Sequence, residues 1–267
     1  METSPKKGNF DFLTAANQGF RVTWENRLLV LRLMAIPFLV KTGCVAFIIF
    51  MGLEEQLLRH GLVMIPAYFA EGFLIAYVIR TLYSGDTLRL DISNARSYYN
   101  DIIAAMIAFV LIQLTFAFVV GYTLSAMPDV PADISVETAN AQEQADALKQ
   151  FLMALSVFAF LLWAFRFAWL HVVIAMGVPL SAFLKRVQSF WSVIPMLGCW
   201  LAVMMPLMFI TFFVSQILGS ALPDLESESA MLTRFLLSVF QAGCEIVVNL
   251  IAALAMSYGF KALMEQE

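Results

Sequence analysis

The chain has 267 residues, of which 61% are hydrophobic and only 13% are charged. A soluble domain carries about 25% charged residues, and its interior could not bury this many apolar side chains. The 24 phenylalanines and five tryptophans also exclude a disordered chain. The net charge of −4 comes without a dense basic tract, so we expect no nucleic-acid partner. The composition predicts a multi-pass membrane protein.

Six stretches are long and apolar enough to cross a bilayer, for which a helix needs about 20 residues. Backbone polar groups in lipid must be satisfied within their own segment, so we expect each stretch to be a transmembrane helix. The stretches cover residues 28–53, 61–83, 101–127, 150–178, 191–219 and 232–260. The predicted fold class is therefore all-α, with residues 1–267 forming a single six-helix transmembrane domain.

An amphipathic segment at about residues 10–27 precedes the first stretch. Its apolar side chains recur at helical spacing, and most of its charged side chains fall elsewhere around the helix. This pattern is typical of a helix that lies in the membrane interface. The apolar positions are Phe10, Leu13, Phe20, Trp24, Leu28 and Leu31.

Two shorter segments, 92–100 and 181–191, combine basic and aromatic residues before the third and fifth stretches. We therefore interpret the chain as three pseudo-repeats, each with an interfacial segment and one helical hairpin. The three units cover residues of about 10–87, 88–179 and 180–267. The loop after the third stretch is rich in helix formers from Ser135 onward, so we expect the fourth helix to begin near that residue.

Lysine and arginine are distributed unequally between the two sides of this topology. The loops after the first, third and fifth stretches hold three of them and ten acidic residues, whereas the side with both termini holds eleven. The positive-inside rule then places both termini in the cytoplasm. No apolar stretch follows Lys6 and Lys7 closely, so we expect the first spanning helix to direct insertion.

Charged side chains at membrane depth are the candidate functional residues, because each costs about 2.5–3.5 kcal/mol to insert. Glu71, Arg166 and Glu245 lie 14, 13 and 14 residues before a glycine or proline that we expect to end each inward helix. Lys41 lies at a similar depth if its helix starts near residue 28, and is either buried or reaches back to the interface. The candidate buried layer consists of Lys41, Glu71, Arg166, Gln241, Glu245 and Asn249.

This layer has two interpretations. In the first, salt bridges within it fix the register of the helices, and Arg166 contacts Glu71 or Glu245 directly or through Gln241 or Asn249. In the second, the layer is a proton or polar-substrate site of a small transporter or proton-coupled carrier. We expect a solvated cavity at Glu245 in a carrier and a dry, fully paired layer in a structural protein.

Sequence signatures of catalysis are missing. The chain has no HExxH, P-loop, dinucleotide-binding or GxSxG motif and no pair of intramembrane aspartates. Cys44, Cys199 and Cys244 show neither disulfide nor metal-ligand spacing. We therefore expect no enzyme activity, catalytic residue, cofactor or metal, and a structural, accessory or assembly role as the main hypothesis.

The segment PLSAFLKRVQSFWSVIP, residues 179–195, resembles the segment before a spanning helix in a superfamily of six-helix bacterial inner-membrane proteins. The superfamily includes the membrane domain attached to some glycerophosphodiester phosphodiesterases, together with related uncharacterised membrane proteins. The resemblance implies a multi-pass protein of the bacterial inner membrane. It implies no hydrolase chemistry, because this chain has no soluble phosphodiesterase domain.

Basic residues on the predicted cytoplasmic side are candidate contacts for lipid head groups. Each is worth about 1 kcal/mol near an anionic leaflet, so together they predict attraction to anionic lipids. These residues are Arg89, Arg96, Lys185 and Arg186. Besides the bilayer, the partners that we consider are a membrane protein or further copies of the chain.

Overall fold

A computed structural model describes residues 10–53, 56–83, 92–126, 141–221 and 229–265, and within these ranges it is helical without strands. This confirms the predicted all-α fold class. Six helical segments are long and apolar enough to span a membrane. The α-helices are α1 (Phe12–Glu25), α2 (Arg27–Met51), α3 (Leu57–Val63), α4 (Ile65–Tyr83), α5 (Ile92–Ala126), α6 (Ala141–Ala164), α7 (Leu170–Ala175), α8 (Leu180–Arg186), α9 (Val193–Ala221) and α10 (Ser229–Met264). Two short 3-10 helices, η1 (Phe165–Trp169) and η2 (Phe190–Ser192), complete the chain order.

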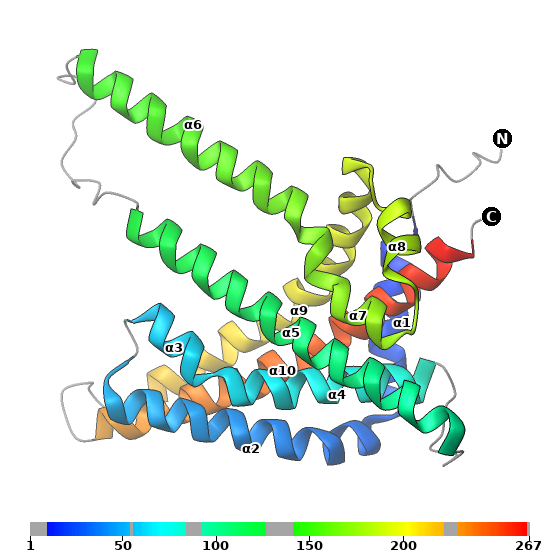
Figure 1. The fold of residues 1–267 in the computed structure, drawn as a ribbon. Helices are drawn as coiled ribbons and strands as arrows, with labels where there is room; N and C mark the ends of the chain where they lie inside the picture. Colours follow the sequence, from blue (N-terminus) through cyan, green and yellow to red (C-terminus); the bar gives the residue numbers. More distant parts are fainter. Residues whose placement is uncertain (1–9, 54–55, 84–91, 127–140, 222–228, 266–267) are drawn as a thin grey trace.

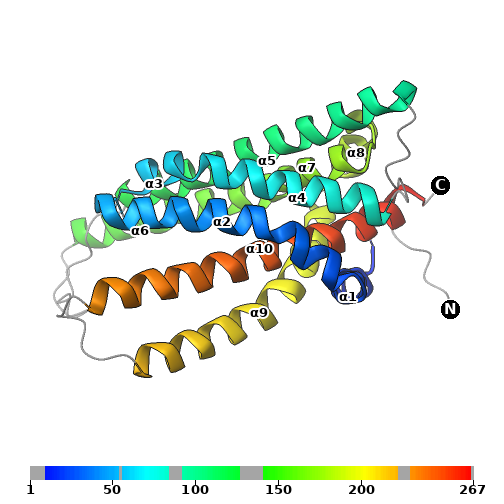
Figure 2. The same cartoon turned by 90° about the horizontal axis from the view of Figure 1, so that it is seen from below.

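The long helices form a bundle whose two ends differ. Helices α1 and α8 and the end of α10 lie at one end, and α3 and the start of α6 lie at the other (Figure 1). Helix α10 packs against α2, α4 and α9, while α4 also packs against α5. Helix α6 diverges from α5 (Figure 1), and α9 diverges from α10 in the view from below (Figure 2). Most side chains between residues 151 and 160 of α6 are consequently exposed.

The helix predicted at about residues 10–27 is confirmed as α1. The Asp11 side chain accepts hydrogen bonds from the backbone N–H groups of Leu13 and Thr14, which caps the helix start. The bond from the Thr14 hydroxyl is the main reason that the pKa of Asp11 lies below its ordinary value. Helix α1 crosses α10 at Gly19, where an added Cβ would lie 2.8 Å from the Ile251 carbonyl oxygen. Only glycine permits this close approach of the two helices.

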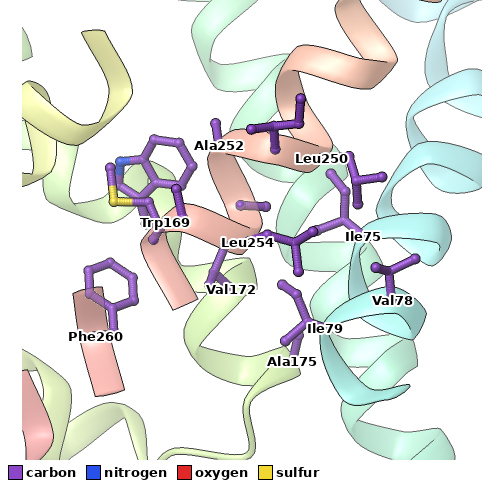
Figure 3. Packing of buried hydrophobic residues seen from close by; sticks show 14 of the residues in the cluster. Ile75, Val78, Ile79, Trp169, Val172, Ala175, Leu250, Ala252, Leu254 and Phe260 are labelled. Carbon is purple, nitrogen blue, oxygen red and sulfur yellow. The ribbon is translucent and has the colours of Figure 1, made fainter. Parts of the chain in front are cut away.

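The core forms where α4, α7 and α10 meet, and its side chains are drawn in Figure 3. The buried cluster combines large side chains with alanines from all three helices, and these fill the space between the helices. The labelled residues are Ile75, Val78 and Ile79 of α4, Trp169 of η1, Val172 and Ala175 of α7, and Leu250, Ala252, Leu254 and Phe260 of α10. This core holds the middle of α10 in place beside α2 and α4.

Three expectations about the helices need correction. Residues 92–100 do not form a separate interfacial segment, because they are the first turns of α5. The stretch 150–178 is not one α-helix, since η1 interrupts it at residues 165–169. Gly259 does not end the last helix, which continues to Met264. In contrast, α8 is a separate short helix before α9, as predicted.

The predicted start of the fourth helix near Ser135 lies outside the described residues. Helix α6 is described from Ala141, ten residues before the start of its membrane-span candidate at Phe151. At 1.5 Å per residue, α6 therefore extends about 15 Å beyond that span.

Candidate functional site

Lys41 lies near the middle of α2. It comes 14 residues after Arg27 and 10 residues before Met51, which corresponds to about 21 Å and 15 Å along the helix. Helix α2 continues through Pro37, so it does not start there. The Lys41 side chain is 1% exposed. Of the two interpretations that the sequence left open, the structure supports a buried lysine and excludes one that reaches the interface.

Two carboxylates from different helices bind the Lys41 ammonium group. The distance from Lys41 Nζ to Glu71 Oε2 of α4 is 3.1 Å, and that to Glu245 Oε2 of α10 is 2.9 Å. Asn249 of α10 donates a hydrogen bond of 2.6 Å from Nδ2 to Glu71 Oε1. We call Lys41, Glu71, Glu245 and Asn249 the charged cluster. All four residues belong to the candidate layer from the sequence, and they join α2, α4 and α10.

The two glutamates of the charged cluster differ in exposure. The Glu71 side chain is 1% exposed and accepts hydrogen bonds at both oxygens, from Lys41 and from Asn249. The Glu245 side chain is 54% exposed, although its Oε2 contacts the buried lysine. Gln241, one turn earlier on α10, is also exposed, so the prediction that these two residues are buried is wrong. The cluster is thus enclosed at Glu71 and open at Glu245.

Arg166 is buried as predicted, but it does not belong to the charged cluster, so the predicted contact with a glutamate is wrong. It is 5% exposed and lies in η1. Its Nη1 donates to the carbonyl oxygens of Val187 at 2.7 Å and Gln188 at 3.1 Å. Its Nε donates to the carbonyl oxygen of Trp163 at 3.0 Å. The guanidinium also stacks on the Trp163 ring, 4.5 Å from its centroid.

Arg166 lies where the end of helix α8 lacks hydrogen-bond donors. Helix α8 ends at Arg186, and the last carbonyl groups of a helix lack intrahelical donors. A cation near this end also interacts favourably with the helix dipole. Arg166 therefore stabilises the end of α8. The position of Arg166 within the apolar stretch 150–178 does not indicate this role.

The candidate head-group contacts are only partly described. Lys185 is exposed and Arg186 is half-buried in the last turn of α8. Arg89 lies outside the described residues, and Arg96 belongs to α5 without a described side chain. At the same end of the bundle, Trp24 is 71% exposed and Trp191 is 74% exposed. Exposed tryptophans beside a basic helix end are typical of residues at the level of lipid head groups.

Other chemistry is limited in the described part of the chain. Its His, Cys, Asp and Glu side chains nowhere gather in a group of three that could hold a metal ion. Comparisons with family models, curated proteins and solved structures find no match to this chain. The charged cluster is therefore the feature from which a function has to be argued.

Proposed function

We propose that the protein is a non-enzymatic integral membrane protein with an accessory or assembly role, in which Glu245 binds a partner within the bilayer. The observation that carries this proposal is the half-exposed Glu245 side chain at the middle of α10. A carboxyl group that faces hydrocarbon costs several kcal/mol, roughly 2.5–3.5 kcal/mol on insertion scales for charged residues. A partner that covers Glu245 with a hydrogen-bond donor removes this cost.

The partner that fits is a transmembrane helix of a different protein, with a basic or amide side chain at mid-depth. A second copy of this chain fits less well, because its two basic residues at membrane depth, Lys41 and Arg166, are buried with partners of their own. Two copies that met at this face would place one Glu245 against the other. Charge complementarity therefore favours an assembly of different proteins.

Cross-linking from Gln241 tests this proposal. A photoreactive amino acid at Gln241 should give one discrete protein adduct in native membranes, and the adduct should be lost in Glu245→Leu. Glu245→Leu leaves the Lys41–Glu71 pair balanced, so the fold should persist. The same photoreactive amino acid at Phe158, exposed on α6, is the control and should react with lipid only.

The adduct supports the proposal only if the captured helix has a donor side chain at mid-depth whose replacement by leucine also abolishes the adduct. A homodimeric adduct, or an adduct that survives Glu245→Leu, contradicts it.

A small transporter or proton-coupled carrier is the second candidate, and the exposure of Glu245 favours it as well. A carrier needs water at this residue during its cycle. In a cysteine-free background, Glu245→Cys should then react with an impermeant thiol reagent in native membranes. If a partner helix covers the residue, the reaction should appear only after detergent separates the proteins.

We also propose that the chain lies in a bacterial inner membrane with both termini in the cytoplasm. The unequal distribution of lysine and arginine supports this orientation, as does the position of α1, α8 and the end of α10 at one end of the bundle. Cysteines introduced at Ala132 and Ser181 in a cysteine-free background should therefore react oppositely with an impermeant thiol reagent. Reaction of Ser181→Cys from outside intact cells would reverse the orientation.

A further inference from the structure

The charged cluster contains one base and two acids. Lys41 contacts both Glu71 and Glu245, and Asn249 adds no charge. If all three ionisable groups are charged, the formal charge of the cluster is −1, and one bound proton makes it zero. The three residues lie in the central parts of spanning helices, where an unbalanced charge is costly and groups neutralise instead.

We infer that the charged cluster is a proton-binding site, in which Glu71 and Glu245 together hold one proton. This inference goes beyond the proposed role in assembly. It applies where lipid or an amide side chain of the partner covers Glu245, because a basic side chain of the partner would balance the second acid without a proton. It rests on the contacts of Lys41 with two acids.

The contacts of the two glutamates indicate on which side of the cluster a proton can enter and leave. Both oxygens of Glu71 already accept hydrogen bonds from donors on other helices, an arrangement that fits a carboxylate. Glu245 contacts Lys41 through Oε2 and is otherwise exposed, so a proton can reach it without opening the bundle. A proton therefore enters and leaves the cluster on the side of Glu245.

The other titratable groups near the charged cluster do not change this balance. From α4, Tyr68 faces the cluster, and from α2, Cys44 lies near Tyr68. A phenol and a thiol are neutral at neutral pH in their ordinary state. Gln241 and Asn249 of α10 carry no charge, and Arg166 binds carbonyl groups in another part of the fold. One base therefore faces two acids.

Infrared spectroscopy of the full chain in lipid vesicles tests the inference, because a protonated carboxyl group has its own C=O stretching band. The wild-type protein should show one such band near neutral pH, and labelling of glutamate with carbon-13 should shift it. Glu71→Gln and Glu245→Gln should each abolish the band, since one acid then faces one base. Lys41→Met should double the band area, because both glutamates then lack a counter-charge.

Two further variants keep the test decisive if Lys41→Met does not fold. Lys41→Met combined with either Glu71→Gln or Glu245→Gln leaves a single acid without a base, so each double variant should keep one band. Glu25→Gln in α1, whose side chain is exposed in a pair with Arg21, is the matched control and should leave the band unchanged. Absence of the band in the wild-type protein, or its persistence in both single glutamine variants, would overturn the inference.

Discussion

Replacement of Lys41 by methionine should lower the free energy of unfolding by about 3–5 kcal/mol, the usual cost of removing one partner from a buried ion pair. Lys41 is 1% exposed and contacts carboxylates from two other helices, so its loss leaves both acids without a counter-charge. Methionine keeps most of the volume of the lysine stem, which limits any effect from packing. Unfolding of the purified protein in mixed micelles, followed by circular dichroism, measures the change.

The triple variant Lys41→Met, Glu71→Gln, Glu245→Gln separates charge from shape. It removes the base and both acids while it keeps the approximate side-chain volumes, so it should be much more stable than Lys41→Met alone. Arg21→Ala is a control for an ion pair on the exposed surface of α1 and should change the stability little. If the triple variant is as unstable as Lys41→Met, packing rather than charge explains the role of Lys41.

The spans and the depth of the charged cluster could be predicted from the sequence. The length of an apolar stretch and the free-energy cost of inserting a charged residue are properties of one helix at a time. Lys41, Glu71 and Glu245 are charges within apolar stretches, and the sequence alone places them at similar depths. The choice of partners could not be predicted, because it depends on how the helices are turned about their axes. The half-exposed state of Glu245 depends on the same tertiary packing.

Arg166 shows why matching depth alone does not identify a contact. The apolar pattern of residues 150–178 continues without a break, and nothing in it indicates the 3-10 segment η1. The carbonyl groups that Arg166 binds belong to the two residues that directly follow α8, about twenty residues later in the chain. The segment 92–100 is a similar case, because a basic and aromatic composition is compatible with an interfacial helix and with the first turns of a long one.

The role of Arg166 in holding the end of α8 leads to the second prediction. Arg166→Leu should lower the free energy of unfolding by about 3 kcal/mol, since hydrogen bonds from a charged donor are worth about 1.5–3 kcal/mol each. The loss is limited because Val187 O also accepts from the Ser192 hydroxyl at 3.1 Å. The free energy of unfolding of Arg166→Lys should lie between those of the wild-type protein and Arg166→Leu. Lysine keeps the charge but loses the planar donor group that stacks on Trp163.

Two measurements distinguish this role from membership of the charged cluster. Hydrogen exchange of the backbone amides between residues 187 and 192 should rise in Arg166→Leu, while exchange around Lys41 should stay unchanged. In a double-mutant cycle, Arg166→Leu and Glu245→Gln should be additive within about 0.5 kcal/mol, as expected for separate sites. Lys41→Met and Glu71→Gln, whose side chains are in contact, should instead couple by about 1–3 kcal/mol. Coupling of Arg166 to either glutamate would place the arginine in the charged cluster after all, because only residues that share a contact or a network depart from additivity by that amount.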